Sequence, residues 1–119
     1  MAYRADHPPL PNPRPVVISG AGIVTSMGCG MEANAAGFRA GRTAFRPVDL
    51  FDVSRQRVGS AGQADLPDRP ALAGLTARIW EQMDRGTRFA LVAAQEALDA
   101  SGVSGAMPVI IGTSAGAMP

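Results

Sequence analysis

The sequence predicts an α/β domain with a mostly parallel sheet, and three observations support this prediction. Two short runs of β-branched residues, 16–18 and 109–111, lie near the two ends of the chain. Between them, apolar residues recur at helical spacing, most clearly over 85–101. Glycines and prolines separate the elements, which follow one another in the order β, α, β, α, β. This alternation is typical of parallel strands with helices packed against them.

The chain begins with a proline-rich segment, 1–14, for which we predict disorder. Five prolines fall between Pro8 and Pro15, and each fixes its own φ angle and favours an extended residue before it. Both a plain tail and a recognition motif for a proline-binding partner fit this composition. The remaining residues, 15–119, are expected to form one small domain.

The first strand is predicted over 15–20, or to 24 if it continues past the glycines. The first helix is predicted over 30–40, because its apolar residues share one helical face. Glycine 41 suits the position just after a helix. A second strand is predicted over 57–64 from a weak, glycine-rich alternation, and a second helix over 71–82.

The third helix, 85–101, is the most informative element. Asp84 suits its N-cap, and Gly102 suits the position just after its last turn. From Phe89 to Ala100 only three residues are polar, namely Gln95, Glu96 and Asp99. A helix that is apolar on most sides is normally buried on more than one of them. A chain of 119 residues rarely encloses such a helix, so we expect the helix to need partners outside this chain. After this helix, a third strand is predicted over 108–112.

Composition excludes several classes of function. The net charge is +1, and the arginines are scattered, so neither nucleic acid nor a membrane surface is expected as a partner. No apolar run approaches the roughly 20 residues that span a bilayer. One cysteine and no apolar signal segment indicate a cytoplasmic protein.

The run GAGIVT at 20–25 raises the alternative of a nucleotide-binding α/β protein. A dinucleotide fingerprint needs G-x-G-x-x-G directly before a helix. Here Thr25 takes the sixth position and the helix begins only near Met31. A phosphate-binding P-loop is excluded, because its motif requires a lysine and the sequence contains none. No cofactor is therefore expected.

Cys29 is the one cysteine of the sequence and therefore the one candidate for a thiol nucleophile. It lies just before a predicted helix. The single histidine, His7, is in the proline-rich segment, so no partner base can be assigned. One cysteine and one distant histidine also cannot make a structural zinc site. We therefore expect Cys29 to be a small, buried or half-buried structural residue, with no catalytic and no metal-binding residue in the chain.

In chain order, several segments resemble the elongating β-ketoacyl-acyl-carrier-protein synthases, which have the thiolase fold. They are VVISGAGIVTSMG at 16–28, LFD at 50–52, AG at 61–62, MDR at 83–85, FALVAAQEAL at 89–98 and VIIGT at 109–113. The resemblance implies a five-layered αβαβα fold of which 15–119 forms only the N-terminal part. It also implies that the helix at 85–101 is similar to a family helix held between two sheets.

The family catalyses a decarboxylative condensation of acyl and malonyl thioesters in fatty-acid or polyketide biosynthesis, with acyl carrier protein as a partner. The resemblance places the family's nucleophilic cysteine and both catalytic histidines beyond this chain, and Cys29 at a loop position. It places Ala115 near the acyl-chain pocket, where a small side chain leaves room for longer acyl groups; a plain turn residue is the other interpretation.

The resemblance implies a homodimer or a complex with a complementary ketosynthase chain. We therefore expect an N-terminal ketosynthase fragment that is inactive by itself. A non-catalytic module that docks onto a complementary ketosynthase subunit is a second hypothesis, and the nucleotide-binding protein is a third.

Overall fold

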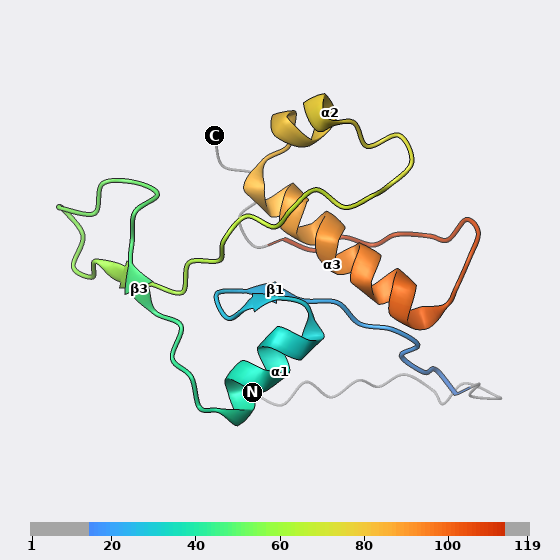
Figure 1. The fold of residues 1–119 in the computed structure, drawn as a ribbon, viewed down its shortest axis with the longest axis horizontal. Helices are drawn as coiled ribbons and strands as arrows, with labels where there is room; N and C mark the ends of the chain where they lie inside the picture. The colour runs from blue at the N-terminus through green and yellow to red at the C-terminus, as the bar shows by residue number, and fades with distance from the viewer. Residues whose placement is uncertain (1–14, 114–119) are drawn as a thin grey trace, which may run out of the picture.

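The structure is a computed structural model that describes residues 15–113 (Figure 1). The first hairpin pairs β1 (Val24–Thr25) with β2 (Gly28–Cys29) in antiparallel register, and α1 (Met31–Arg39) follows it directly. The hairpin also packs on the long helix described below.

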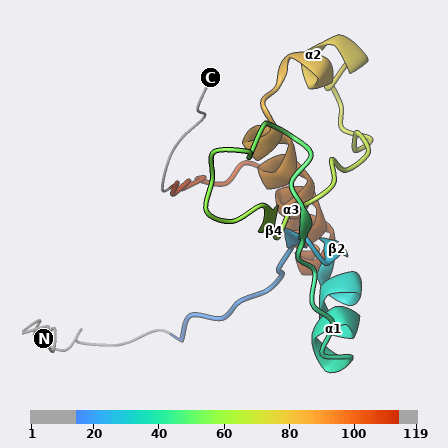
Figure 2. The same cartoon turned by 90° about the vertical axis from the view of Figure 1, so that its left-hand side faces the viewer.

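The described chain after α1 holds one more hairpin and two helices. Strands β3 (Arg46–Pro47) and β4 (Ser60–Ala61) pair antiparallel. Helix α2 (Ala77–Gln82) precedes the long helix α3 (Arg85–Ser101). In Figures 1 and 2, α3 lies between α2 above and α1 below.

The predicted helix ends are confirmed at α1 and α3. Helix α1 ends at Arg39, and Gly41 adopts φ +60°, a conformation that favours glycine. The Asp84 carboxylate accepts the Thr87 N–H at 2.9 Å and so caps α3. Gly102 ends the helix with φ +64°.

The predicted strands at 15–20 and 108–112 do not form among residues 15–113. Both segments lack ladder partners, and the Val16 and Ile110 side chains are 95% and 98% exposed. Of the strand predicted over 57–64, only Ser60–Ala61 is paired. The two sheets described are antiparallel rather than parallel. Because a strand is defined by its neighbour, the β-branched composition alone does not create one.

Helix α2 is shorter than the predicted 71–82. Gly74 adopts φ +82°, and Thr76 is the N-cap whose hydroxyl accepts the Ile79 N–H at 3.2 Å. Leu75 and Trp80 are the only buried apolar side chains in the described residues. The Arg88 guanidinium lies 5.3 Å from the centre of the Trp80 ring and covers one side of this small core.

No residue of α3 is buried in the described chain, and the burial on more than one side that the sequence predicts would come from the partners expected outside this chain. The reason is that the described chain covers only part of the helix, and Leu98 remains 38% exposed. Within residues 15–113, no helix combines the length and apolar character that crossing a membrane requires. The prediction of disorder for 1–14 falls outside the described residues.

Candidate functional site

The glycine segment at 20–22 lies directly against the backbone of α3. A Cβ atom on Gly20 would lie 2.1 Å from the carbonyl oxygen of Ala97, and one on Gly22 would lie 1.9 Å from that of Ala93. Such distances are far below van der Waals contact, so only glycine fits at either position. The two glycines let an extended segment cross a helix in backbone contact.

This geometry does not favour the nucleotide-binding alternative. A phosphate cradle presents backbone N–H groups to an anion. Here the Cβ positions of Gly20 and Gly22 instead meet helix carbonyl oxygens, which repel an anion. The glycines are explained by close packing.

Glu96 of α3 fixes the chain on both sides of the first hairpin. Its Oε2 atom accepts the Ile23 N–H at 3.0 Å, and its Oε1 atom accepts the Met31 N–H at 2.6 Å. Met31 is the first residue of α1, whose preceding residue Gly30 has no side chain to cap the helix. A carboxylate at a helix N-terminus is also favoured by the helix dipole. Glu96 therefore acts as a cap supplied from another helix.

Asn34 of α1 forms hydrogen bonds with residues of the same hairpin. Its side chain is 2% exposed, and its Nδ2 atom donates to the carbonyl oxygens of Gly28 at 3.0 Å and Gly30 at 2.8 Å. Its Oδ1 atom accepts from the Thr25 hydroxyl, which in turn accepts the Met27 N–H at 3.0 Å. All the polar atoms of this buried amide are thus used, as burial requires.

The structure places Cys29 on the two-residue strand β2 with an exposed side chain, so the expectation of a buried or half-buried cysteine is wrong. Partial loss of solvation is the main cause that raises the pKa of its thiol, and the carboxylates of Asp65, Asp68 and Glu96 raise it further. A nucleophilic cysteine needs the opposite shift. This environment therefore does not favour a nucleophilic thiol, and the structural role of Cys29 stays a prediction.

We expect the Cys29 thiol to react more slowly with iodoacetamide at pH 7 than the same thiol in the urea-unfolded chain. The raised pKa leaves less thiolate in the folded state, so the folded rate should keep rising at pH values where the unfolded rate has levelled off. Alkylation rates measured between pH 6 and 10 test this. A folded chain that reacts faster than the unfolded one at pH 7 would contradict it.

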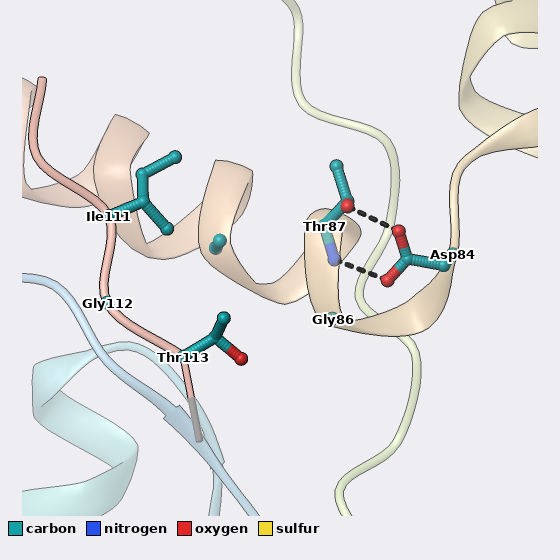
Figure 3. A pocket seen from close by; sticks show the side chains of 7 residues that line it. Asp84, Gly86, Thr87, Ile111, Gly112 and Thr113 are labelled. Carbon is teal, nitrogen blue, oxygen red and sulfur yellow. Dashed lines mark hydrogen bonds between the residues drawn. The ribbon is translucent and has the colours of Figure 1, made fainter. Parts of the chain in front are cut away.

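An open hollow of about 310 Å³ lies between the start of α3 and the segment that ends at residue 113 (Figure 3). Its lining residues are Asp84, Gly86, Thr87, Ala90, Ile111, Gly112 and Thr113. Asp84 is the acidic group there, and its two oxygens accept from the Thr87 N–H and the Thr87 hydroxyl. It therefore serves as a helix cap.

The pH dependence of this cap follows from its hydrogen bonds. The Thr87 hydroxyl, followed by the Thr87 N–H, lowers the pKa of Asp84. A lowered folded-state pKa adds stability above the unfolded pKa of about 3.9, and this stability is lost as the pH falls through the folded value. We expect the protection factor of the Thr87 amide, its exchange rate relative to the unfolded rate at the same pH, to fall below about pH 4. Asp84→Asn, which caps without titrating, should show no such change; an equal response in this variant would contradict the assignment.

Ala115, the predicted acyl-pocket position, lies outside the described residues, so its role stays a prediction. The described chain ends at Thr113, on the edge of the hollow. Within 15–113, no three His, Cys, Asp or Glu residues are grouped closely enough to hold a metal ion.

Sequence reasoning missed the roles of Glu96 and Asn34. Glu96 did stand out as one of three polar residues in an apolar stretch of helix, and this was a usable signal. Asn34 gave no comparable signal, because an asparagine in a short amphipathic helix is ordinarily exposed.

Fold and site together define a structural α/β unit: a glycine segment clamped to a long helix, with no assembled catalytic group in the part described. Comparison with known proteins then identifies the family. The chain belongs to the β-ketoacyl synthase family, since the model of the "Beta-ketoacyl synthase, N-terminal domain" matches residues 13–118.

Curated relatives are named as polyketide synthases of Streptomyces. The chain is 43% identical over 104 residues to the oxytetracycline polyketide putative beta-ketoacyl synthase 1 of Streptomyces rimosus, covering 87% of this chain and 24% of that protein. It is 41% identical to the tetracenomycin ketoacyl synthase alpha subunit of Streptomyces glaucescens, covering 85% and 24%. It is 38% identical to the beta subunit of the same system, covering 76% and 22%. The chain thus spans about a quarter of these relatives' length, and no solved structure matches it significantly.

Proposed function

We propose that this chain is the N-terminal structural part of a β-ketoacyl synthase of polyketide biosynthesis. The complete synthase would condense acyl and malonyl thioesters, delivered by an acyl carrier protein, with loss of carbon dioxide. The family match over 13–118 carries this proposal. The polyketide pathway is chosen over fatty-acid synthesis because the names of the relatives specify polyketides. In this proposal the protein acts in the cytoplasm.

The chain would contribute architecture, and the nucleophile and bases would come from the rest of the synthase. Cys29 supports this division, because it is exposed, its pKa is raised and residues 15–113 contain no histidine to activate it. In the complete enzyme, the two hydrogen bonds of Glu96 and the contact of Gly20 and Gly22 with α3 would hold the first hairpin rigidly against this helix.

The test is a condensation assay with acyl- and malonyl-loaded carrier protein. The 119-residue chain alone should give no turnover. Co-expression with the unmatched part of the Streptomyces rimosus relative should give measurable turnover. Cys29→Ala in the complex is the matched control and should leave the rate unchanged. Turnover by the chain alone, or its loss on Cys29→Ala, would refute the assignment.

A second candidate function is a non-catalytic module that docks onto a complementary ketosynthase subunit. Exposed apolar side chains beside α3, such as Ile18 and Ile110, favour it, since large apolar patches usually mark interaction sites. The match to a protein named as a beta subunit is compatible with it. A stable complex that lacks turnover with every loaded carrier protein would favour this candidate over the first.

A further inference from the structure

Residues 75–82, which include the short helix α2, form a small unit with a core of its own, called the α2 unit below. Leu75 and Trp80, the two buried apolar side chains of the described chain, both belong to it. The Thr76 hydroxyl accepts the Ile79 N–H at 3.2 Å, and the Thr76 carbonyl oxygen accepts the Trp80 N–H at 3.0 Å. Among the described elements, α2 packs closely against no other helix or strand. Figures 1 and 2 both show it beyond the start of α3.

The backbone on both sides of the α2 unit has the conformation of a hinge. Gly74, just before the unit, adopts φ +82°, and a Cβ atom there would meet no described atom within 4 Å. After the unit, Met83 and Asp84 are both extended, with ψ angles of 142° and 163°, between two helices. Hinges are commonly a few residues at the ends of elements, where large changes of φ and ψ are absorbed. Residues 74 and 83–84 are therefore the positions at which the unit turns relative to α3.

One side chain of α3, Arg88, joins the α2 unit to the long helix. Its Nη2 atom donates to the carbonyl oxygen of Glu81 at 2.9 Å, and its Nε atom donates to that of Met83 at 3.1 Å. Its guanidinium carbon lies 5.3 Å from the centre of the Trp80 ring. The helix dipole favours a cation near the C-terminal carbonyl groups of α2, and the ring quadrupole favours one over the indole.

No other side chain of α3 forms a hydrogen bond with residues 75–83 in the described structure. The remaining side-chain bond to the unit comes from Arg69, which donates to the Leu75 carbonyl oxygen at 2.7 Å. This bond lies directly beside the first hinge and does not involve α3. The attachment of the α2 unit to the long helix by hydrogen bonds therefore depends on Arg88.

We infer that the α2 unit is a hinged strap that opens and closes on the start of α3 as one piece, with Arg88 as its latch. In the closed state, one guanidinium holds two carbonyl groups and covers the Trp80 ring. In the open state, the indole ring and the guanidinium are both presented to solvent. Segments with few packed contacts open locally at a lower free energy than the whole fold unfolds. The inference concerns contacts within this chain and does not depend on the proposed function.

Hydrogen exchange of the 119-residue chain, measured in urea concentrations below its unfolding transition, tests the strap. The amides of Ile79 and Trp80 should have protection factors at least about tenfold lower than that of Ala94 in the middle of α3. Their protection should also depend less on urea, because opening of the strap exposes less surface than global unfolding. Equal protection and equal urea dependence at the three amides would show that α2 opens only with the whole fold, and would overturn the inference.

Three arginine variants test the latch, with the single tryptophan of the sequence as the probe. Arg88→Ala removes both hydrogen bonds and the cation over the ring, so acrylamide quenching of Trp80 should increase at least about twofold. Arg88→Lys keeps the charge but lacks the planar fork, and should resemble Arg88→Ala more than the parent. Arg78→Ala is the matched control, since Arg78 is exposed on α2 and has no partner among the described residues. It should leave the quenching unchanged.

The other outcomes of these variants overturn the latch. Quenching like that of the parent in Arg88→Ala or Arg88→Lys would show that the guanidinium does not hold the strap. An equal increase in Arg78→Ala would show that loss of a positive charge alone opens it. Far-ultraviolet circular dichroism and the protection of Ala94 should stay those of the parent. Their loss in Arg88→Ala would show that Arg88 stabilises the whole fold rather than the strap.

Discussion

Substitution of Gly22 by alanine is expected to lower the free energy of unfolding by about 3 kcal/mol, at the upper end of the usual range for overpacking. The added Cβ would lie 1.9 Å from the Ala93 carbonyl oxygen. That oxygen belongs to the backbone of α3, which cannot rotate away as a side chain does. The glycine segment would have to leave the helix, and the hairpin that follows it would move too. Urea unfolding followed by circular dichroism measures the change.

Gly112→Ala is the matched control for this variant. A Cβ atom at position 112 would meet no atom of residues 15–113 within 4 Å, so the free energy of unfolding should change by less than about 0.5 kcal/mol. Gly20→Ala should behave like Gly22→Ala, because its Cβ would lie 2.1 Å from the Ala97 oxygen. Equal stability of the variants at 22 and 112 would disprove the close contact.

Substitution of Glu96 by alanine is expected to lower the free energy of unfolding by about 2 kcal/mol, since hydrogen bonds to a charged group contribute more than neutral ones. The Ile23 and Met31 N–H groups would both lose their acceptor. The first turn of α1 should therefore fray, and the amide of Met31 should exchange faster. Glu96→Gln keeps one carbonyl oxygen and should show a smaller loss.

The control for Glu96 lies one residue earlier on the same helix. Gln95 donates to Asp99 at 2.6 Å, one turn further along α3, and among the described residues it makes no hydrogen bond to the hairpin. Gln95→Ala should therefore lower stability by about 0.5 kcal/mol at most and leave the Met31 amide unchanged. A Gln95→Ala effect as large as that of Glu96→Ala would contradict the cross-helix cap.

Local sequence signals predicted the ends of two helices well. Asp84 and Gly102 delimit α3 as expected, because a cap depends on hydrogen bonds and φ angles within a few residues. The site was predicted less completely. The role of Cys29 stays a prediction, and Glu96 was not assigned any contact, since its partners are 65 and 73 residues away in the chain.

The strands were predicted least well, and the reason is physical. A helix satisfies its backbone groups within its own segment, whereas a strand needs a neighbour. The β-branched run at 109–111 is extended and exposed because the described chain offers it no partner.

The sequence by itself determined the family and both ends of α3, because these depend on residue order and on interactions between near neighbours. Only the tertiary structure decided what the glycines and Glu96 do. It showed that Gly20 and Gly22 bring a segment into contact with α3, and that Glu96 caps α1 from that same helix. Both roles depend on contacts between residues more than 60 positions apart, and no local pattern encodes which distant backbone a residue will meet.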